Sequence, residues 1–339
     1  MHNIDLSRSL KSDRLSLGVT ALNGLMGEKL QKSNNPLAVN MGFFHRNRPL
    51  ALTRAQFEAT EQPVTDKLVV FLHGLASNEQ MWAFPSSEDQ QTRDSYGSLL
   101  MHELGFTPLY VRYNSGLRIS YNGQLLAALL EELLQVYPEP VKELVLIGHS
   151  LGGLLIRSAC HYGRQSGLDW TAIMSKAFYI GTPHHGVPWE ALTAGFFRRM
   201  AVSESSLAQS ISALHESRSP ALRDIVNISL IDEHWQEDKT QTPIPWFEGA
   251  EHYFIAGSIN RNPNHVVSHA FGDVLVPIGS AQSRSALHGH LPVPPNLDQN
   301  SVIVPGVKHI ALAQHPRVYR HLADWLSGPK NNMEVMGSE

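Results

Sequence analysis

The sequence predicts an α/β fold in which a mostly parallel central sheet is flanked by helices. From Leu68 onward, short apolar runs alternate with longer segments of helical periodicity, which is the pattern of strands joined by crossover helices. The apolar runs are nearly continuous, as is typical of strands buried on both faces. The clearest helix is Gly123–Val136, where leucines recur at helical spacing. The predicted strands are 68–72, 109–113, 144–147, 177–180, 253–256 and 302–304.

Composition limits the classes of function. The 339 residues include 27 basic and 31 acidic side chains, and no Lys/Arg cluster would bind a phosphate backbone, so nucleic acid is not an expected partner. Cys160 is the only cysteine, which excludes an intramolecular disulfide and a thiolate zinc cluster. The 18 histidines lack the spacing of a catalytic metal site. No catalytic metal or other cofactor is therefore expected. A structural calcium near 272–277 stays an alternative, because carboxylate and carbonyl ligands have no clear linear signature here.

The N-terminal segment is polar for about a dozen residues, and no stretch approaches the roughly 18 continuous apolar residues of a membrane span. We therefore predict neither a signal peptide nor a transmembrane helix, and a cytoplasmic location.

Two segments depart from the strand–helix alternation. Before residue 67, an apolar pattern from Leu15 to Leu30 predicts a helix, and 36–52 offers two antiparallel edge strands. After Gly186 the next strand is delayed by about 65 residues, a length usually associated with function. The predicted division is an N-terminal segment at 1–66 packed on the core, an α/β core at 67–186 and 251–328, a helical cap or lid insertion at 187–250, and a flexible tail at 329–339.

A candidate nucleophile lies between a predicted strand and a helical pattern, in Gly148-His149-Ser150-Leu151-Gly152. In a G-x-S-x-G turn of this context, the serine occupies a strained bend that raises its hydroxyl above the sheet, and side chains at the two glycine positions would collide. The alternative interpretation is an ordinary strand-to-helix turn. The strand before the motif and the helix after it favour the interpretation of Ser150 as a nucleophile.

A serine hydroxyl needs an imidazole to take its proton and a carboxylate to hold that imidazole. In this topology the order is Ser, Asp/Glu, His. His309 directly follows the last predicted strand, and Asp273 follows the strand before it, so both lie at the carboxyl edge of the sheet. A simple turn aspartate is the alternative for Asp273. Other acids, within the predicted cap, are Asp232, Glu233, Glu237 and Asp238.

The tetrahedral intermediate also needs two backbone N–H donors. Leu151 is expected to supply one, because it immediately follows the nucleophile. The loop after the first central strand, His73-Gly74-Leu75, is expected to supply the other through the Leu75 amide.

Together these elements resemble an α/β-hydrolase of the lipase/esterase kind, particularly the bacterial group related to triacylglycerol lipases and GPI inositol-deacylase-like proteins. The resemblance implies Ser150 as nucleophile, His309 as general base and acid, and Asp273 as the orienting carboxylate. It also implies the Leu75 and Leu151 amides as oxyanion donors. At the acid loop the sequence departs from this group, because Val274 follows Asp273 where a glycine is commoner. The resemblance rests on residues 73–75, 113–123, 148–153, 180–188, 272–277 and 309, and on the opening LNGLMGEKL and NPLAVNM segments.

Two segments are candidates for the substrate pocket. Thr182 to His185 end a strand beside the nucleophile, and we favour a rigid turn over a pocket wall because Pro183 fixes the backbone. The first cap helix groups apolar residues on one side, which either pack on the sheet or form an acyl-chain pocket under a movable lid. These candidate substrate-binding residues are Trp189, Leu192, Phe196, Phe197 and Met200.

The sequence therefore predicts a serine hydrolase that cleaves carboxylic esters through an acyl-enzyme. Its expected substrates are small-molecule or lipid esters, with medium-chain or lipid-like acyl groups. A thioesterase or amidase would use the same machinery, and a non-catalytic protein that binds acyl ligands is a third alternative. Exposed aromatic residues on the cap would favour a transient contact with a membrane surface.

Overall fold

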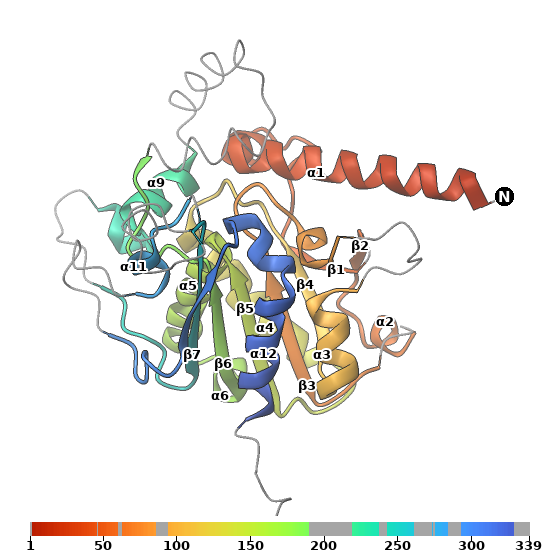
Figure 1. Ribbon diagram of the computed structural model, residues 1–339. Helices are drawn as coiled ribbons and strands as arrows, with labels where there is room; N and C mark the ends of the chain where they lie inside the picture. The colour runs from red at the N-terminus through yellow and green to blue at the C-terminus, as the bar shows by residue number, and fades with distance from the viewer. Residues whose placement is uncertain are drawn as a thin grey trace, which may run out of the picture.

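The structure is a computed structural model (Figure 1). It describes residues 2–45, 47–59, 63–85, 94–189, 219–236, 243–260, 273, 275–283 and 293–328, with side chains from residue 15 onward.

The central sheet has eight strands in the order β2-β1-β4-β3-β5-β6-β7-β8. β1 runs antiparallel to both of its neighbours, and all other neighbouring pairs are parallel. The predicted mostly parallel sheet flanked by helices is confirmed, and each predicted strand overlaps an observed one. The strands are β1 (Gly42–His45), β2 (Arg48–Leu50), β3 (Lys67–Leu72), β4 (Thr107–Arg112), β5 (Glu143–His149), β6 (Met174–Ile180), β7 (Glu251–Ser258) and β8 (Ser301–Pro305).

Helices cover both faces of the sheet (Figure 1). α4 (Ile119–Val136), α5 (Leu151–Gln165) and α6 (Trp170–Ile173) lie on one face, and α3 (Tyr96–Leu104) and α12 (Pro316–Ser327) lie on the other. Strand β3 shows why both faces are apolar. Leu68, Val70 and Leu72 belong to the core under α4 and α5, whereas Val69 and Phe71 belong to the core under α3 and α12. This alternation explains the continuous apolar runs in the sequence.

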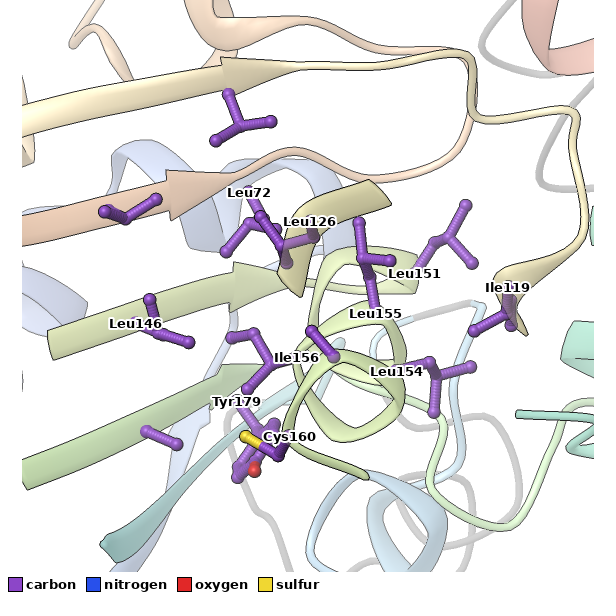
Figure 2. Close-up of a cluster of buried hydrophobic side chains, with 14 of the residues drawn as sticks. Leu72, Ile119, Leu126, Leu146, Leu151, Leu154, Leu155, Ile156, Cys160 and Tyr179 are labelled. Atoms are coloured by element: carbon purple, nitrogen blue, oxygen red, sulfur yellow. The ribbon is translucent and has the colours of Figure 1, made fainter. Parts of the chain in front are cut away.

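The core beneath α5 holds the turn that bears Ser150. Figure 2 shows Leu151, Leu154 and Leu155 of α5 among buried side chains from α4 and the strands. Leu72 and Leu146 reach the same cluster from β3 and β5. Because these side chains are buried, the start of α5 is fixed relative to the carboxyl ends of the central strands.

The N-terminal segment contains helix α1 (His2–Lys32), the edge strands β1 and β2, and the short helix α2 (Arg54–Glu58). The apolar pattern predicted the helix but marks only part of its packed face. Leu30 is buried and Leu25 packs on the core, whereas Leu15 is 72% exposed and Met26 is 38% exposed. The small and polar residues Asn23 and Gly27 are also buried, and Figure 1 shows α1 lying across the same end of the molecule as α9.

In the segment predicted as a cap, the structure describes α9 (Pro220–Asn227) and the 3₁₀ helix η2 (Asp232–Trp235). The expected cap helices at 190–202 and 207–215 lie outside the described residues, as does the tail at 329–339. The remaining elements are the 3₁₀ helices η1 (Glu79–Trp82) and η4 (His309–Gln314) and the short helix α11 (Ile278–Ala281). None of the described helices combines the length and apolar character needed to cross a membrane.

Candidate active site

The turn between β5 and α5 carries Ser150 in a strained backbone conformation. Ser150 has φ 55° and ψ −120°, which L residues rarely adopt. A Cβ on Gly148 would lie 2.5 Å from the carbonyl carbon of Gly152, and a Cβ on Gly152 would lie 2.8 Å from the carbonyl oxygen of His73. Real Cβ atoms do not approach other atoms this closely, so the steric reason predicted for both glycines is confirmed.

Backbone contacts hold Ser150 at the carboxyl edge of the sheet. Its N–H donates to the carbonyl oxygen of Ile180 at the end of β6, over 2.9 Å. Ser150 also precedes the first residue of the 15-residue helix α5, and its side chain makes no capping hydrogen bond. The Leu151 N–H therefore belongs to the first turn of α5, where the helix dipole favours negative charge.

Asp273 and His309 form a buried pair. Nδ1 of His309 lies 2.7 Å from Oδ2 of Asp273, and the Asp273 side chain is fully buried. The His309 backbone N–H also donates to the carbonyl oxygen of Asp273 over 3.1 Å. The two residues, separated by 36 positions, are thus joined through both main chain and side chain.

The contacts of Asp273 orient the His309 ring. Oδ1 of Asp273 accepts the backbone N–H groups of Leu275 and Val276 over 3.1 and 2.9 Å. With the carboxylate acting as an acceptor on both oxygens, the proton between Asp273 and His309 lies on Nδ1. Nε2 of His309 is then free to accept a proton. That atom is buried and has no hydrogen-bond partner among the described residues.

The His309 ring lies beside the residues that flank Ser150 and the end of β6. A Cβ on Gly181 would lie 3.1 Å from Cε1 and Nδ1 of His309. Gly181 directly follows Ile180, which accepts the Ser150 N–H. The rings of His309 and His149, the residue before Ser150, have centroids 4.7 Å apart. The three residues expected to act together are therefore brought to one region.

His149 has a structural role that the sequence analysis missed. Its Nε2 lies 2.9 Å from the carbonyl oxygen of His309, to which it donates a hydrogen bond. The ring is buried and stands edge-on to Trp82. His149, which directly precedes Ser150, thus connects the nucleophile turn to the loop that carries His309. Only the presence of a ring nitrogen at that position could have suggested this contact.

His73 fixes the peptide group that contains the Leu75 amide. Nδ1 of His73 donates to the carbonyl oxygen of Gly74 over 2.8 Å, and Nε2 accepts the Tyr113 N–H over 3.3 Å. The Tyr113 ring stacks on His73 with centroids 4.2 Å apart, and its hydroxyl donates to the His73 carbonyl oxygen. Because C=O of Gly74 and N–H of Leu75 share one planar peptide group, these bonds set the direction of the Leu75 N–H.

The segment after β6 forms a turn, in which the Gly186 N–H donates to the carbonyl oxygen of Pro183 over 3.0 Å. His184 is fully buried among aromatic rings and stands edge-on to Tyr179, Trp246 and Phe254. Burial holds the pKa of His184 well below its usual value, so the ring is neutral. The expected turn is therefore present, but neither ring nitrogen of His184 has a hydrogen-bond partner among the described residues.

Of the five candidate substrate-binding residues, the structure describes Trp189, which is partly buried against the core under α5. Leu192, Phe196, Phe197 and Met200 lie outside the described residues. Within the described part of the chain, no group of three or more His, Cys, Asp or Glu side chains is arranged to hold a metal ion.

Strand order and structural comparison agree on the fold: the chain has an α/β-hydrolase fold, as the sequence resemblance implied. Residues 62–214 match the model of the family "Putative serine esterase (DUF676)". This stretch includes Ser150 and Leu75, and the match supports hydrolase activity.

Solved structures that are similar to the chain include the following three. A mature lipase from Bacillus licheniformis is 17% identical, with a TM-score of 0.50, over 80% of this chain and 96% of that chain. An α/β hydrolase fold protein from Chitinophaga pinensis is 13% identical, with a TM-score of 0.44, over 79% of this chain and 91% of that chain. An esterase from Pyrococcus furiosus is 15% identical, with a TM-score of 0.44, over 77% of this chain and 80% of that chain. No curated protein matches the chain.

Proposed function

We propose that this protein is a serine hydrolase that cleaves carboxylic esters through a covalent acyl-enzyme. The observation that carries the proposal is the Asp273–His309 pair. Nε2 of His309 is buried and has no hydrogen-bond partner among the described residues. The His309 ring packs against His149, the residue before the strained turn of Ser150. A buried imidazole with one nitrogen committed to a carboxylate and the other open suits a general base.

In the acylation step, Nε2 of His309 takes the proton of the Ser150 hydroxyl as Oγ attacks the ester carbonyl carbon. The resulting oxyanion accepts hydrogen bonds from the N–H groups of Leu75 and Leu151. When the bond from carbon to the leaving oxygen breaks, the imidazolium returns the proton to the departing alcohol. Asp273 stabilises the imidazolium and keeps its proton on Nδ1.

Deacylation repeats these steps with water. His309 takes a proton from the water, the hydroxide attacks the acyl-enzyme carbonyl, and the collapse of the second tetrahedral intermediate releases the acid and restores the Ser150 hydroxyl.

We propose medium-chain or lipid-like acyl groups as substrates. The support is compositional: the segment that follows Trp189 contains paired phenylalanines with Leu192 and Met200, which suit a hydrophobic acyl chain better than acetate. Trp189, partly buried at the start of this segment, would border such a pocket.

The first test is hydrolysis of p-nitrophenyl esters from acetyl to palmitoyl by the wild type and by Ser150→Ala. We expect Ser150→Ala to lower kcat by about 10³-fold or more and the wild type to prefer one range of chain lengths. Ser166→Ala, at the exposed end of α5, is the control and should retain full activity. Wild-type activity in Ser150→Ala would refute the proposal.

Matched ester, thioester and amide substrates separate the related reactions, and faster turnover of a thioester or an amide would replace the ester assignment. Labelling with an organophosphonate tests the nucleophile directly. A folded wild type that resists this reagent would favour a non-catalytic protein that binds acyl ligands.

A further inference from the structure

The loop after β3 has an uncommon backbone conformation beside the proposed oxyanion donor. Ala76, which directly follows Leu75, has φ 54°, in the left-handed region. L residues other than asparagine and aspartate seldom adopt this region unless their surroundings hold them there. Ala76 is 3% exposed, so the contacts around it determine where the loop lies.

Helix α1 makes the closest of these contacts. At Gly24 the helix approaches Ala76 so closely that a Cβ on Gly24 would lie 2.7 Å from Cβ, 2.8 Å from Cα and 3.0 Å from N of Ala76. Two of these three atoms belong to the backbone of the loop. A side chain at position 24 would therefore have to displace either the loop or the helix.

Two hydrogen bonds hold the same loop. Nδ2 of Asn78 donates to Oγ of Ser16 on α1 over 3.2 Å, while Oδ1 of Asn78 caps the 3₁₀ helix η1. On the other side, the Ala76 N–H donates to Oγ of Ser115 over 2.9 Å, in the loop after β4. Ser16 and Gly24 are eight residues apart and so lie on one face of α1.

Hydrogen bonds of two asparagine side chains fix α1 to its neighbours. Nδ2 of Asn114 donates to the carbonyl oxygen of Gly27 over 3.1 Å. Asn23 is fully buried, accepts the Val39 N–H and donates to the carbonyl oxygen of Leu37. The helix is thus fixed both to the loop after β4 and to the chain that follows it.

We propose that α1 positions the oxyanion hole, because its Gly24 and Ser16 hold the Leu75–Asn78 loop that presents the Leu75 N–H. The inference rests on the function proposed above and extends it to a helix outside the α/β core. A displacement of about 1 Å in an oxyanion donor lowers the rate of catalysis by orders of magnitude while affecting substrate binding less. α1 is therefore expected to affect kcat more than KM.

The test is Gly24→Ala in the full chain, with kcat counted per active site titrated by an organophosphonate. We expect kcat to fall by about 10- to 100-fold and KM to change by less than about threefold. The affinity for a trifluoromethyl ketone, whose adduct with Ser150 carries an oxyanion, should weaken in parallel with kcat/KM. A purely structural role would change the fraction of titratable sites but not kcat per site.

Gly18→Ala is the matched control, because it lies in the same helix and, apart from the adjoining helix backbone, no atom lies within 4 Å of its added Cβ. It should retain wild-type kcat. Ala76→Gly removes the atom nearest to the new methyl group and suits the positive φ, so adding it to Gly24→Ala should restore at least part of kcat.

An unchanged kcat per site in Gly24→Ala, or an equal loss in Gly18→Ala, would overturn the inference. If Gly24→Ala does not fold, Ser16→Ala decides: a reduced kcat per site supports the role of α1, and an unchanged kcat refutes it. Failure of the proposed function is distinguishable, because the wild type would then not react with the phosphonate and Ser150→Ala would keep any activity present.

Discussion

Asp273 is the residue whose role depends most directly on individual hydrogen bonds. Its carboxylate accepts two backbone N–H groups on Oδ1 and faces Nδ1 of His309 with Oδ2. An asparagine would have nearly the same shape and could keep the backbone contacts through its carbonyl oxygen. Its NH₂ group would then face Nδ1 and donate to it, which would place the ring proton on Nε2.

We therefore predict that Asp273→Asn lowers kcat by about 10³- to 10⁴-fold, because the protonated Nε2 cannot accept the Ser150 proton. The measurement is ester hydrolysis, with folding followed by circular dichroism. Asp232→Asn is the control: Asp232 is exposed, accepts a hydrogen bond from Gln124 and was one of the alternative acids. An equal loss in both variants would contradict the assignment.

Sequence patterns identified these residues to different degrees. The glycines around Ser150 follow from steric limits on the turn, which a short motif can express. His309 follows from its position after the last strand. Asp273 has no such local signature, since its partners are two adjacent N–H groups and a ring 36 residues away. The contacts of His73 with Tyr113 and of His149 with His309 also escaped prediction, because they join segments from different strands.

At the scale of elements, helices α4 and α5 approach closely at a pair of small residues. A Cβ on Gly123 of α4 would overlap Oγ of Ser158 on α5 and would lie 2.6 Å from its Cβ. The same Oγ donates to the carbonyl oxygen of Leu230, beyond α9, over 2.6 Å. Ser158 is fully buried, so the helix pair has little room to adjust.

We predict that Gly123→Ala destabilises the protein by about 1 to 3 kcal/mol, the usual cost of overpacking a core. The result would be a lower unfolding midpoint in urea. Gly18→Ala, another substitution within a helix but with open space around it, should be neutral or stabilising by up to about 1 kcal/mol. A Gly123→Ala midpoint at or above that of the wild type would show that the helices separate at no cost.

The elements themselves were largely predictable, but the packing of α1 was not. Strands buried on both faces produce apolar runs that any sheet of this class must have. In α1, hydrophobic periodicity predicted the helix and Leu30 is buried, yet Leu15 and Met26 are exposed while Asn23, Gly24 and Gly27 are buried. Close approach of two backbones requires small residues, so hydrophobic periodicity identifies only part of this packed face.

At the scale of the whole molecule, the described part of 187–250 is attached to the core through two buried ionisable groups. Arg157 of α5 donates to the carbonyl oxygen of Ile244 over 3.1 Å and lies 4.3 Å from the centre of the Trp246 ring. Burial lowers the pKa of Arg157 to about 10, which leaves it charged at neutral pH.

The second attachment is Asp224 of α9, which is fully buried. Its carboxylate accepts the Ile119 N–H at the start of α4 over 2.7 Å and the Trp235 ring N–H over 2.8 Å. The guanidinium groups of Arg118 and Arg223 lie on the Trp235 ring, 3.8 and 4.7 Å from its centre. Three segments of the chain therefore meet around one carboxyl group.

Asp224 is expected to make stability depend on pH. Desolvation is the main cause that raises its pKa to about 7, although the hydrogen bonds and the two arginines oppose the shift. In the unfolded chain the pKa is about 3.9. Between these values the folded protein binds a proton that the unfolded chain has lost. The contribution of Asp224 to stability is therefore fully present below about pH 4 and is lost as pH rises through about 7, by up to about 1.4 kcal/mol per pH unit.

Asp224→Asn removes this titration. Its one oxygen can accept one of the two N–H groups, and the loss of the other hydrogen bond lowers stability by an amount that does not depend on pH. We predict that the variant gains stability relative to the wild type as the pH is raised from 5 to 8, measured as the difference between their unfolding free energies in urea at each pH. The remaining groups, including the 18 histidines, titrate in both proteins and cancel in that difference. A difference that is constant across this range, or that shifts in favour of the wild type at high pH, would mean that the carboxylate is already charged at pH 5 and that the arginines outweigh burial.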